Sequence, residues 1–135
     1  MDLNQLDKFP HLFPPPGAKH FVRTGLLTIP AVAGTTVIET IQLTASMEGW
    51  VRQIGLEAGD FSVINFQITQ GTAPLDDFTR IKVPLGNVST PMSVFIPIPV
   101  NVPLNLNVLS DGTSAQPVRW LLSGWMYSRQ QAGGS

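Results

Sequence analysis

Every even-numbered residue from Met92 to Val108 is apolar, whereas the odd positions between them carry proline, asparagine, serine and phenylalanine. Alternation with a period of two is typical of a half-buried β-strand, because successive side chains leave opposite faces. Pro97, Pro99 and Pro103 share one parity and have no backbone N–H, so they remove hydrogen-bond donors along one side. We therefore expect one edge of this segment to be open or irregular.

The same segment is too long to be a single strand. At about 3.3 Å per residue it would extend over roughly 55 Å. A compact chain of 135 residues is only about 35–40 Å across. The pattern therefore predicts two strands joined at a corner around Pro97–Pro103, which is typical of an all-β sandwich or barrel.

Further short strands follow one another from His20 onward, and we predict them at residues 21–29, 35–45, 50–56, 61–69, 80–85 and 117–127. The apolar positions change parity near Val63–Ile64, which predicts a β-bulge, and Ser110–Thr113 predicts a turn. About eight strands, with no repeat, predict an all-β fold: an antiparallel β-sandwich of jelly-roll-like topology. We expect the helix content to be under about 10%.

The strand expected at 35–45 has Val37, Ile41 and Leu43 on one face, which Glu39 alone interrupts. Thr36 and Glu39 match a helix capping box, but the β-branched residues around them favour a strand. An inward Glu39 is a candidate for a buried ion pair with one of three arginines, Arg23, Arg52 or Arg119. We expect a structural role for this pair rather than a catalytic one.

Composition divides the chain into an extended Pro-rich N-terminal arm (1–19), a β-sandwich domain (20–129) and a flexible tail (130–135). The prolines of the arm favour an extended polyproline conformation, with Gly17 as a hinge. Its large apolar residues cannot be buried within so short a segment, so they need a groove on this subunit or on a neighbour. The partner-contact candidates in the arm are Leu6, Phe9, Leu12 and Phe13.

Charged residues make up only 13% of the chain, about half the usual share. So few charges favour a surface packed against partners over a monomer covered by Ser, Thr, Asn and Gln. The net charge of −1 predicts neither a nucleic acid nor an anionic membrane as partner. There is no signal-peptide pattern and no apolar run near the ~18 residues of a membrane span, so we expect a soluble protein made in the cytoplasm.

No motif for catalysis or cofactor binding stands out. The chain has no cysteine, no nucleophile elbow and no Gly-rich phosphate loop. His11 and His20 lack a third convergent metal ligand, and turn chemistry explains Asp60 and Asp76–Asp77 better than calcium binding does. We therefore expect no enzyme activity, no cofactor and no metal site. A glycosidase-type carboxylate pair, which is spatial, is the distant alternative.

Both faces of the last strand are largely apolar. One face carries Val118, Trp120, Leu122 and Met126, and we assign it to the core. The other face carries Leu121, Trp125 and Tyr127, which are our remaining partner-contact candidates. Something must cover this second face, either the arm or another subunit, and tryptophan and tyrosine are favoured contact anchors. A platform on which sugar rings stack is the alternative interpretation.

The arm, the segments TGLLTIPAVAGTTVIETIQLTA and NVPLNLNVLSDG, and the ending LSGWMYSR together resemble small jelly-roll accessory proteins of tailed bacteriophage virions. The resemblance is greatest to capsid decoration (cement) proteins and covers most of residues 20–129. It implies a non-enzymatic virion protein that forms a homo-oligomer, a dimer or trimer, and stabilises the capsid by binding the major capsid protein or another virion protein. A carbohydrate-binding module, or an adaptor of a tail or head fibre, is the alternative.

Overall fold

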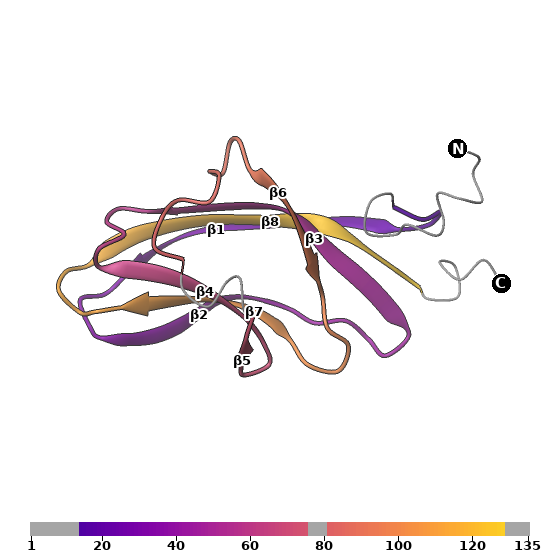
Figure 1. The fold of residues 1–135 in the computed structure, drawn as a ribbon, viewed down its shortest axis with the longest axis horizontal. Coiled ribbons are helices and arrows are strands. Elements are labelled where there is room, and N and C mark those ends of the chain that lie inside the picture. Colours follow the sequence, from indigo (N-terminus) through magenta and orange to yellow (C-terminus); the bar gives the residue numbers. More distant parts are fainter. Residues whose placement is uncertain (1–13, 76–80, 129–135) are drawn as a thin grey trace.

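The computed structural model describes residues 14–75 and 81–128, which form two antiparallel four-stranded sheets and no helix. The strands are β1 (Lys19–Ile29), β2 (Gly34–Ile41), β3 (Met47–Ala58), β4 (Ile64–Gln70), β5 (Ala73–Pro74), β6 (Met92–Pro97), β7 (Leu104–Ser110) and β8 (Gln116–Ser128). Figure 1 shows the sheets as two layers that face each other. The predicted all-β antiparallel sandwich is therefore confirmed.

The strand order is that of a jelly roll. One sheet has the order β1-β8-β3-β6 and the other has the order β2-β7-β4-β5. The neighbouring pairs β4–β5, β3–β6, β2–β7 and β1–β8 are successive pairs of one long hairpin, and they alternate between the two sheets. This folding of a hairpin across two sheets is the jelly-roll topology. We call the surface of the β1-β8-β3-β6 sheet that faces away from the other sheet the outer face.

The alternating segment is divided at a corner, as its pattern predicts. Strands β6 and β7 lie in different sheets, and residues 98–103 connect them. Ile98 N–H donates to the Gly49 carbonyl at 2.9 Å, and Gly71 N–H donates to the Pro103 carbonyl at 2.7 Å. Strand β6 lies at the edge of its sheet, where prolines cost the fewest ladder hydrogen bonds.

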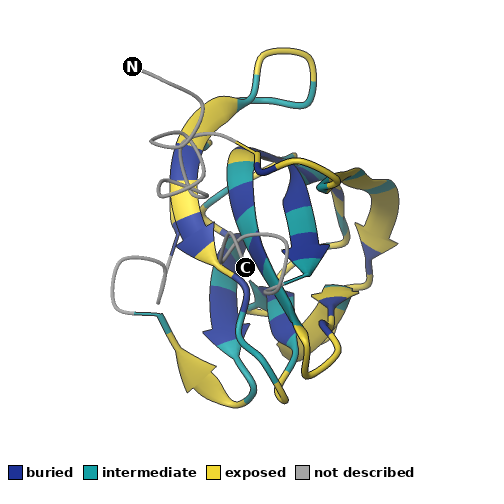
Figure 2. Cartoon of the chain, turned by 90° about the vertical axis from the view of Figure 1, so that its right-hand side faces the viewer, coloured by how far each residue is buried: buried dark blue, intermediate teal, exposed yellow. Residues whose placement is uncertain are grey.

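Apolar side chains of both sheets fill the space between the layers. Figure 2 shows buried and exposed residues alternating along the strands. The core includes Val51, Ile54, Leu56, Ile64, Phe66, Ile68, Leu104, Leu106, Val108, Val118, Trp120 and Leu122. Because Trp120 and Leu122 belong to it, the predicted core face of the last strand is confirmed.

The β-bulge predicted near Val63–Ile64 is wrong. The backbone N–H groups of Val63 and Ile64 both donate to the Asp60 carbonyl, each at 3.1 Å. Residues 61–63 therefore form a turn, and β4 begins only at Ile64. The change of parity marks the start of the strand rather than an extra residue inside it.

The strand predicted at residues 80–85 is also absent from the described part of that segment, residues 81–85. Two isolated bridges occur there instead, Ile81 with Phe66 and Leu85 with Leu56. Pro84 lies between the two bridged residues, and a proline cannot donate to a ladder. The segment therefore contacts both sheets without extending either of them.

The strand predicted at 35–45 ends at Ile41, and its register shifts between Val37 and Glu39. A register shift of one residue moves the following side chains to the other face. Val37 is consequently 54% exposed, contrary to its predicted place on the apolar face, whereas Ile41 is 1% exposed. Glu39 lies opposite Leu106 of the core and is half-buried.

Residues 15–18 form a tight turn rather than an extended hinge. Ala18 N–H donates to the Pro15 carbonyl at 3.0 Å, and Gly17 has a φ of 79°. A proline followed by a glycine in this conformation is typical of a type II β-turn. The arm candidates Leu6, Phe9, Leu12 and Phe13, the last residue of the predicted domain, Arg129, and the predicted tail, residues 130–135, lie outside the described residues.

Candidate functional site

The outer face carries a cluster of aromatic and charged side chains where β3 and β8 run side by side. Their antiparallel pairing places Trp50 opposite Trp125 and Glu48 opposite Tyr127. Residues directly opposite each other in a sheet point to the same face and contact each other. Trp125 is 8% exposed and Tyr127 is 1% exposed, yet neither belongs to the core between the sheets.

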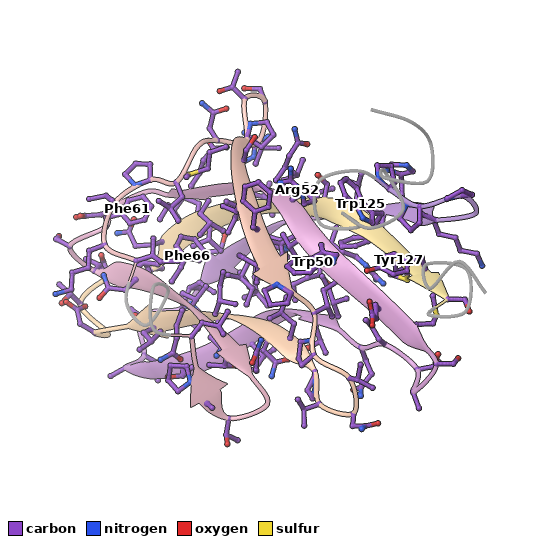
Figure 3. The ribbon with its side chains drawn as sticks, turned by 45° about the vertical axis from the view of Figure 1, so that its right-hand side comes forward. Trp50, Arg52, Phe61, Phe66, Trp125 and Tyr127 are labelled. Carbon is purple, nitrogen blue, oxygen red and sulfur yellow. The ribbon has the colours of Figure 1, made fainter. Side chains whose placement is uncertain are left out.

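A chain of hydrogen bonds holds the buried phenol of Tyr127. Trp50 Nε1–H donates to Tyr127 Oη at 3.3 Å, and Tyr127 Oη–H donates to Glu48 Oε2 at 3.0 Å. Buried tyrosine and tryptophan side chains need such partners for their polar atoms. These hydrogen bonds therefore fix the orientation of the Trp50 and Tyr127 rings on this face (Figure 3).

Arg52 lies at an irregularity in β3, because the register shifts between Val51 and Gln53 in both pairings of this strand. Its guanidinium carbon is 4.0 Å from the centroid of the Phe95 ring and 5.5 Å from that of Trp125. Arg52 Nη1 also donates a hydrogen bond to the Val94 carbonyl. The bulge thus directs one cation toward two aromatic rings, a geometry that favours cation–π attraction. Figure 3 shows Arg52 beside Trp125.

A hollow of about 410 Å³ lies beside this cation. Its lining consists of His20, Phe21, Val22, Arg52, Gln53, Ser93, Ser123, Gly124 and Trp125. Ser123 Oγ–H donates to Gln53 Oε1 at 3.0 Å, and the His20 ring meets Trp125 edge-on with a centroid separation of 6.0 Å. The lining contains no carboxylate, so its chemistry suits a neutral polar or anionic ligand more than a cation.

The sugar-platform interpretation requires an aromatic ring with an open face. Trp125 is only 8% exposed and contacts both Arg52 and His20, so its ring presents little surface to a ligand. Phe95 is 52% exposed, but Arg52 is stacked over its ring. The outer face therefore resembles a packed and rigid contact surface more closely than an open stacking platform.

The predicted contact residues of the last strand all lie on this outer face. Leu121 is half-buried opposite Gly55, next to the cluster that contains Trp125 and Tyr127. The sequence pattern did not predict the roles of Trp50, Arg52 and Phe95. Phe95 carried a signal, because it is the one aromatic residue at the odd positions of the alternating segment.

The ion pair expected for Glu39 is wrong. Trp120 Nε1–H donates to Glu39 Oε1 at 3.2 Å, and among residues 14–75 and 81–128 the carboxylate forms no ion pair with an arginine. After the register shift in β2, Glu39 lies opposite the core residue Leu106, where the indole of Trp120 donates to its carboxylate. A single charge-assisted hydrogen bond therefore takes the place of the expected ion pair.

The aspartates of two turns have lowered pKa values. In Asp60, hydrogen bonds from the Ser62 hydroxyl and backbone N–H stabilise the carboxylate and lower its pKa. In Asp111, the backbone N–H and hydroxyl of Thr113 lower the pKa in the same way. Both are Asx-type turn interactions. A role in stabilising the turns therefore accounts for the positions of Asp60 and Asp111 without a bound ligand.

Two further findings limit the kinds of site. The described part of the chain contains no group of three or more His, Cys, Asp or Glu side chains placed to hold a metal ion. Within the same residues, no helix is long and apolar enough to span a bilayer. The outer-face cluster is therefore the strongest candidate for a functional surface.

The fold defines the class of this protein as a jelly-roll β-sandwich. No protein-family model, curated protein or solved structure matches the chain. The fold by itself does not define a function, since jelly rolls serve many unrelated functions.

Proposed function

We propose that this chain is a non-enzymatic capsid decoration (cement) protein of a tailed-bacteriophage virion, which binds the outside of the shell and stabilises it. The observation that carries the proposal is the outer face, where Arg52, Phe95 and Trp125 form a rigid aromatic surface with one central cation. Arginine and large aromatic residues dominate the energetics of protein interfaces, and side chains fixed in advance lose little entropy on binding.

The low charge of the chain supports the same proposal. Charged residues are 13% of the sequence, and exposed large apolar side chains occur on both sheets, Leu26 and Phe95 on one and Val37 on the other. A surface of this kind gains free energy when a partner covers it. A protein that binds only the expanded shell stabilises that shell by mass action, and many copies add the effect of multivalency.

Co-sedimentation with shells tests the proposal directly. The probe is shells assembled from the major capsid protein encoded together with this chain, prepared in unexpanded and expanded forms. We expect the protein to pellet with the expanded shells up to a saturating ratio and to raise their temperature of disassembly. Failure to pellet with either form would refute the proposal.

A matched pair of variants locates the contact. Phe95 is 52% exposed on the outer face, and Val83 is 60% exposed outside it. We expect Phe95→Ala to weaken shell binding by at least about tenfold, and we expect Val83→Ala to leave it unchanged. Equal binding by the two variants would show that the outer face is not the contact surface.

The arm is the second element of the proposal. A segment this short and rich in proline cannot bury its own apolar residues Leu6, Phe9, Leu12 and Phe13, and we propose that they reach a neighbouring virion protein. Deleting residues 1–13 should leave the thermal midpoint nearly unchanged and weaken shell binding. A truncated protein that does not fold would assign the arm to the core instead.

A carbohydrate-binding module is the second candidate function. The hollow lined by Gln53, Ser93 and Ser123 beside Trp125 is the observation that favours it. Soluble glycans that quench tryptophan fluorescence in the wild type, but not in Trp125→Phe, would support this candidate over capsid binding.

A further inference from the structure

The four edge strands of the sandwich differ in how easily another strand can pair with them. β2 contains a register shift between Val37 and Glu39, β5 is only the dipeptide Ala73–Pro74, and β6 ends at Pro97 after an irregular pairing with β3. Bulges, short length and prolines are the devices by which proteins prevent edge-to-edge pairing. Three of the four edges are thus protected.

The fourth edge, β1, has none of these devices. It spans Lys19–Ile29 without a proline, and it pairs with β8 over its whole length with no shift of register. Among residues 14–75 and 81–128, no strand pairs with its other side. A long edge in regular register, without a bulge or a proline, is a template for an additional strand.

The backbone groups along this edge follow from the pairings of β3 and β8. Leu56 N–H donates to the Leu85 carbonyl at 2.9 Å, so the backbone N–H and C=O of Leu56 point away from β8. The backbone groups of the opposite residue, Trp120, therefore point toward β1. Trp120 lies opposite Gly25, and hydrogen-bonding direction alternates along a strand. The N–H and C=O groups that point away from the sheet therefore belong to the even-numbered residues His20, Val22, Thr24, Leu26 and Thr28.

The side chains along the edge are apolar and positively charged. Val22 is 63% exposed and Leu26 is 70% exposed, and both point to the outer face. Lys19 and Arg23 are the cations of β1, which contains no acidic residue. A partner strand must therefore cover the apolar pair without bringing a second cation close to Arg23.

A second copy of β1 meets both conditions, and we propose that two copies of this chain pair antiparallel along β1, about a two-fold axis at Thr24. In this register Val22 lies opposite the partner's Leu26, and Phe21 lies opposite the partner's Leu27. Arg23 lies opposite the partner's Gly25. The contact is isologous, so each of these favourable pairs forms twice.

Neighbouring registers fit less well. A two-fold axis at Arg23 would place this cation directly opposite the partner's Arg23, and like charges in that position are destabilising. An axis at Gly25 would place Val22 opposite the partner's Thr28 and Leu26 opposite the partner's Thr24, so the apolar pairs would be lost. The proposal concerns the free protein and does not rest on shell binding.

Cysteine cross-linking tests the register, because the chain has no cysteine of its own. Thr24→Cys places two thiols across the axis at about 5.5 Å between Cα atoms, which a disulfide can bridge. Thr28→Cys is the matched control, since Thr28 is an exposed threonine on the same edge. In the dimer its partner thiol would be eight residues away, or about 26 Å. We expect a disulfide-linked dimer with Thr24→Cys alone after mild oxidation.

Sedimentation equilibrium tests the surface. Leu26→Lys places a charge in the proposed contact, opposite the partner's Val22, and should weaken the dimer by at least about tenfold. Val32→Lys is the matched control, because Val32 is 68% exposed and lies beyond β1. It should leave the dimer unchanged.

Three results would overturn the proposal. They are a monomeric wild type throughout a concentration series up to millimolar, equal cross-linking by the two cysteine variants, and a Leu26→Lys variant as dimeric as the wild type. A protein that dimerises through β1 but does not pellet with shells would retain this inference while refuting the capsid proposal.

Discussion

Trp120 and Trp125 lie on the same strand and are almost equally shielded, with 7% and 8% of their surfaces exposed. Trp120 points between the sheets, donates a hydrogen bond to Glu39 and belongs to the core. Trp125 points to the outer face, where Arg52 and His20 contact its ring. The surroundings of the two rings therefore differ: one lies between the two sheets, and the other lies on the outer face against side chains of its own sheet.

This difference has an energetic consequence. The cavity left by Trp120 would be enclosed by two sheets and could collapse only in part, whereas the space left by Trp125 would adjoin the hollow that this ring lines on the outer face. The cost of removing a buried side chain depends on how well its site can relax. We therefore expect Trp120 to matter more for stability and Trp125 to matter more for the surface.

The largest expected effect is that of Trp120→Ala, which should lower the free energy of unfolding by about 3–5 kcal/mol. It empties a core position and removes the donor to the Glu39 carboxylate. Urea denaturation followed by circular dichroism measures the loss, and Trp120→Phe, which keeps a ring, should lose less. A loss below that of Trp125→Ala would invert the comparison.

Gly25→Ala tests whether Trp120 is packed as tightly as the structure indicates. A Cβ at Gly25 would overlap the indole of Trp120 at Cζ2, so one of the two groups must move. We expect a loss of about 1–3 kcal/mol from overpacking. In a Trp120→Ala background the same substitution should cost much less, and additive losses in the double-mutant cycle would contradict the contact.

Trp125→Ala should cost about 1–2 kcal/mol of stability, because water can enter the space that the ring leaves. It should also weaken binding to a shell or partner by about 2 kcal/mol if this face is the contact surface. Denaturation and co-sedimentation on the same sample separate the two effects. Unchanged binding together with a large loss of stability would assign Trp125 to structure alone.

Arg52→Lys is expected to have the smallest effect of the series. Lysine keeps the charge but loses the planar group that stacks over Phe95, so we expect a loss of about 0.5–1 kcal/mol. Arg119→Lys is the control, since Arg119 is exposed on the same strand as Trp125. A loss of stability equal to that of the control would show that the cation–π contacts contribute nothing measurable.

Much of the fold could be predicted from the sequence, because the period-two pattern is a local property. The alternation at residues 92–108 predicted two strands and the corner between them, and the faces of residues 117–127 predicted which tryptophan enters the core. The errors arose where apolar residues precede the start of a strand, as Val63 precedes β4, or where a register shift changes the face of the following side chains, as at Glu39.

The candidate surface could be predicted only in part. The sequence alone determined that Trp125 and Tyr127 share a face, because their spacing of two residues decides it. Only the tertiary structure decided that Trp50 and Glu48 lie opposite them and that Arg52 lies between Phe95 and Trp125. The physical reason is that register depends on hydrogen bonds between strands far apart in the sequence, as with Trp50 and Tyr127, 77 residues apart.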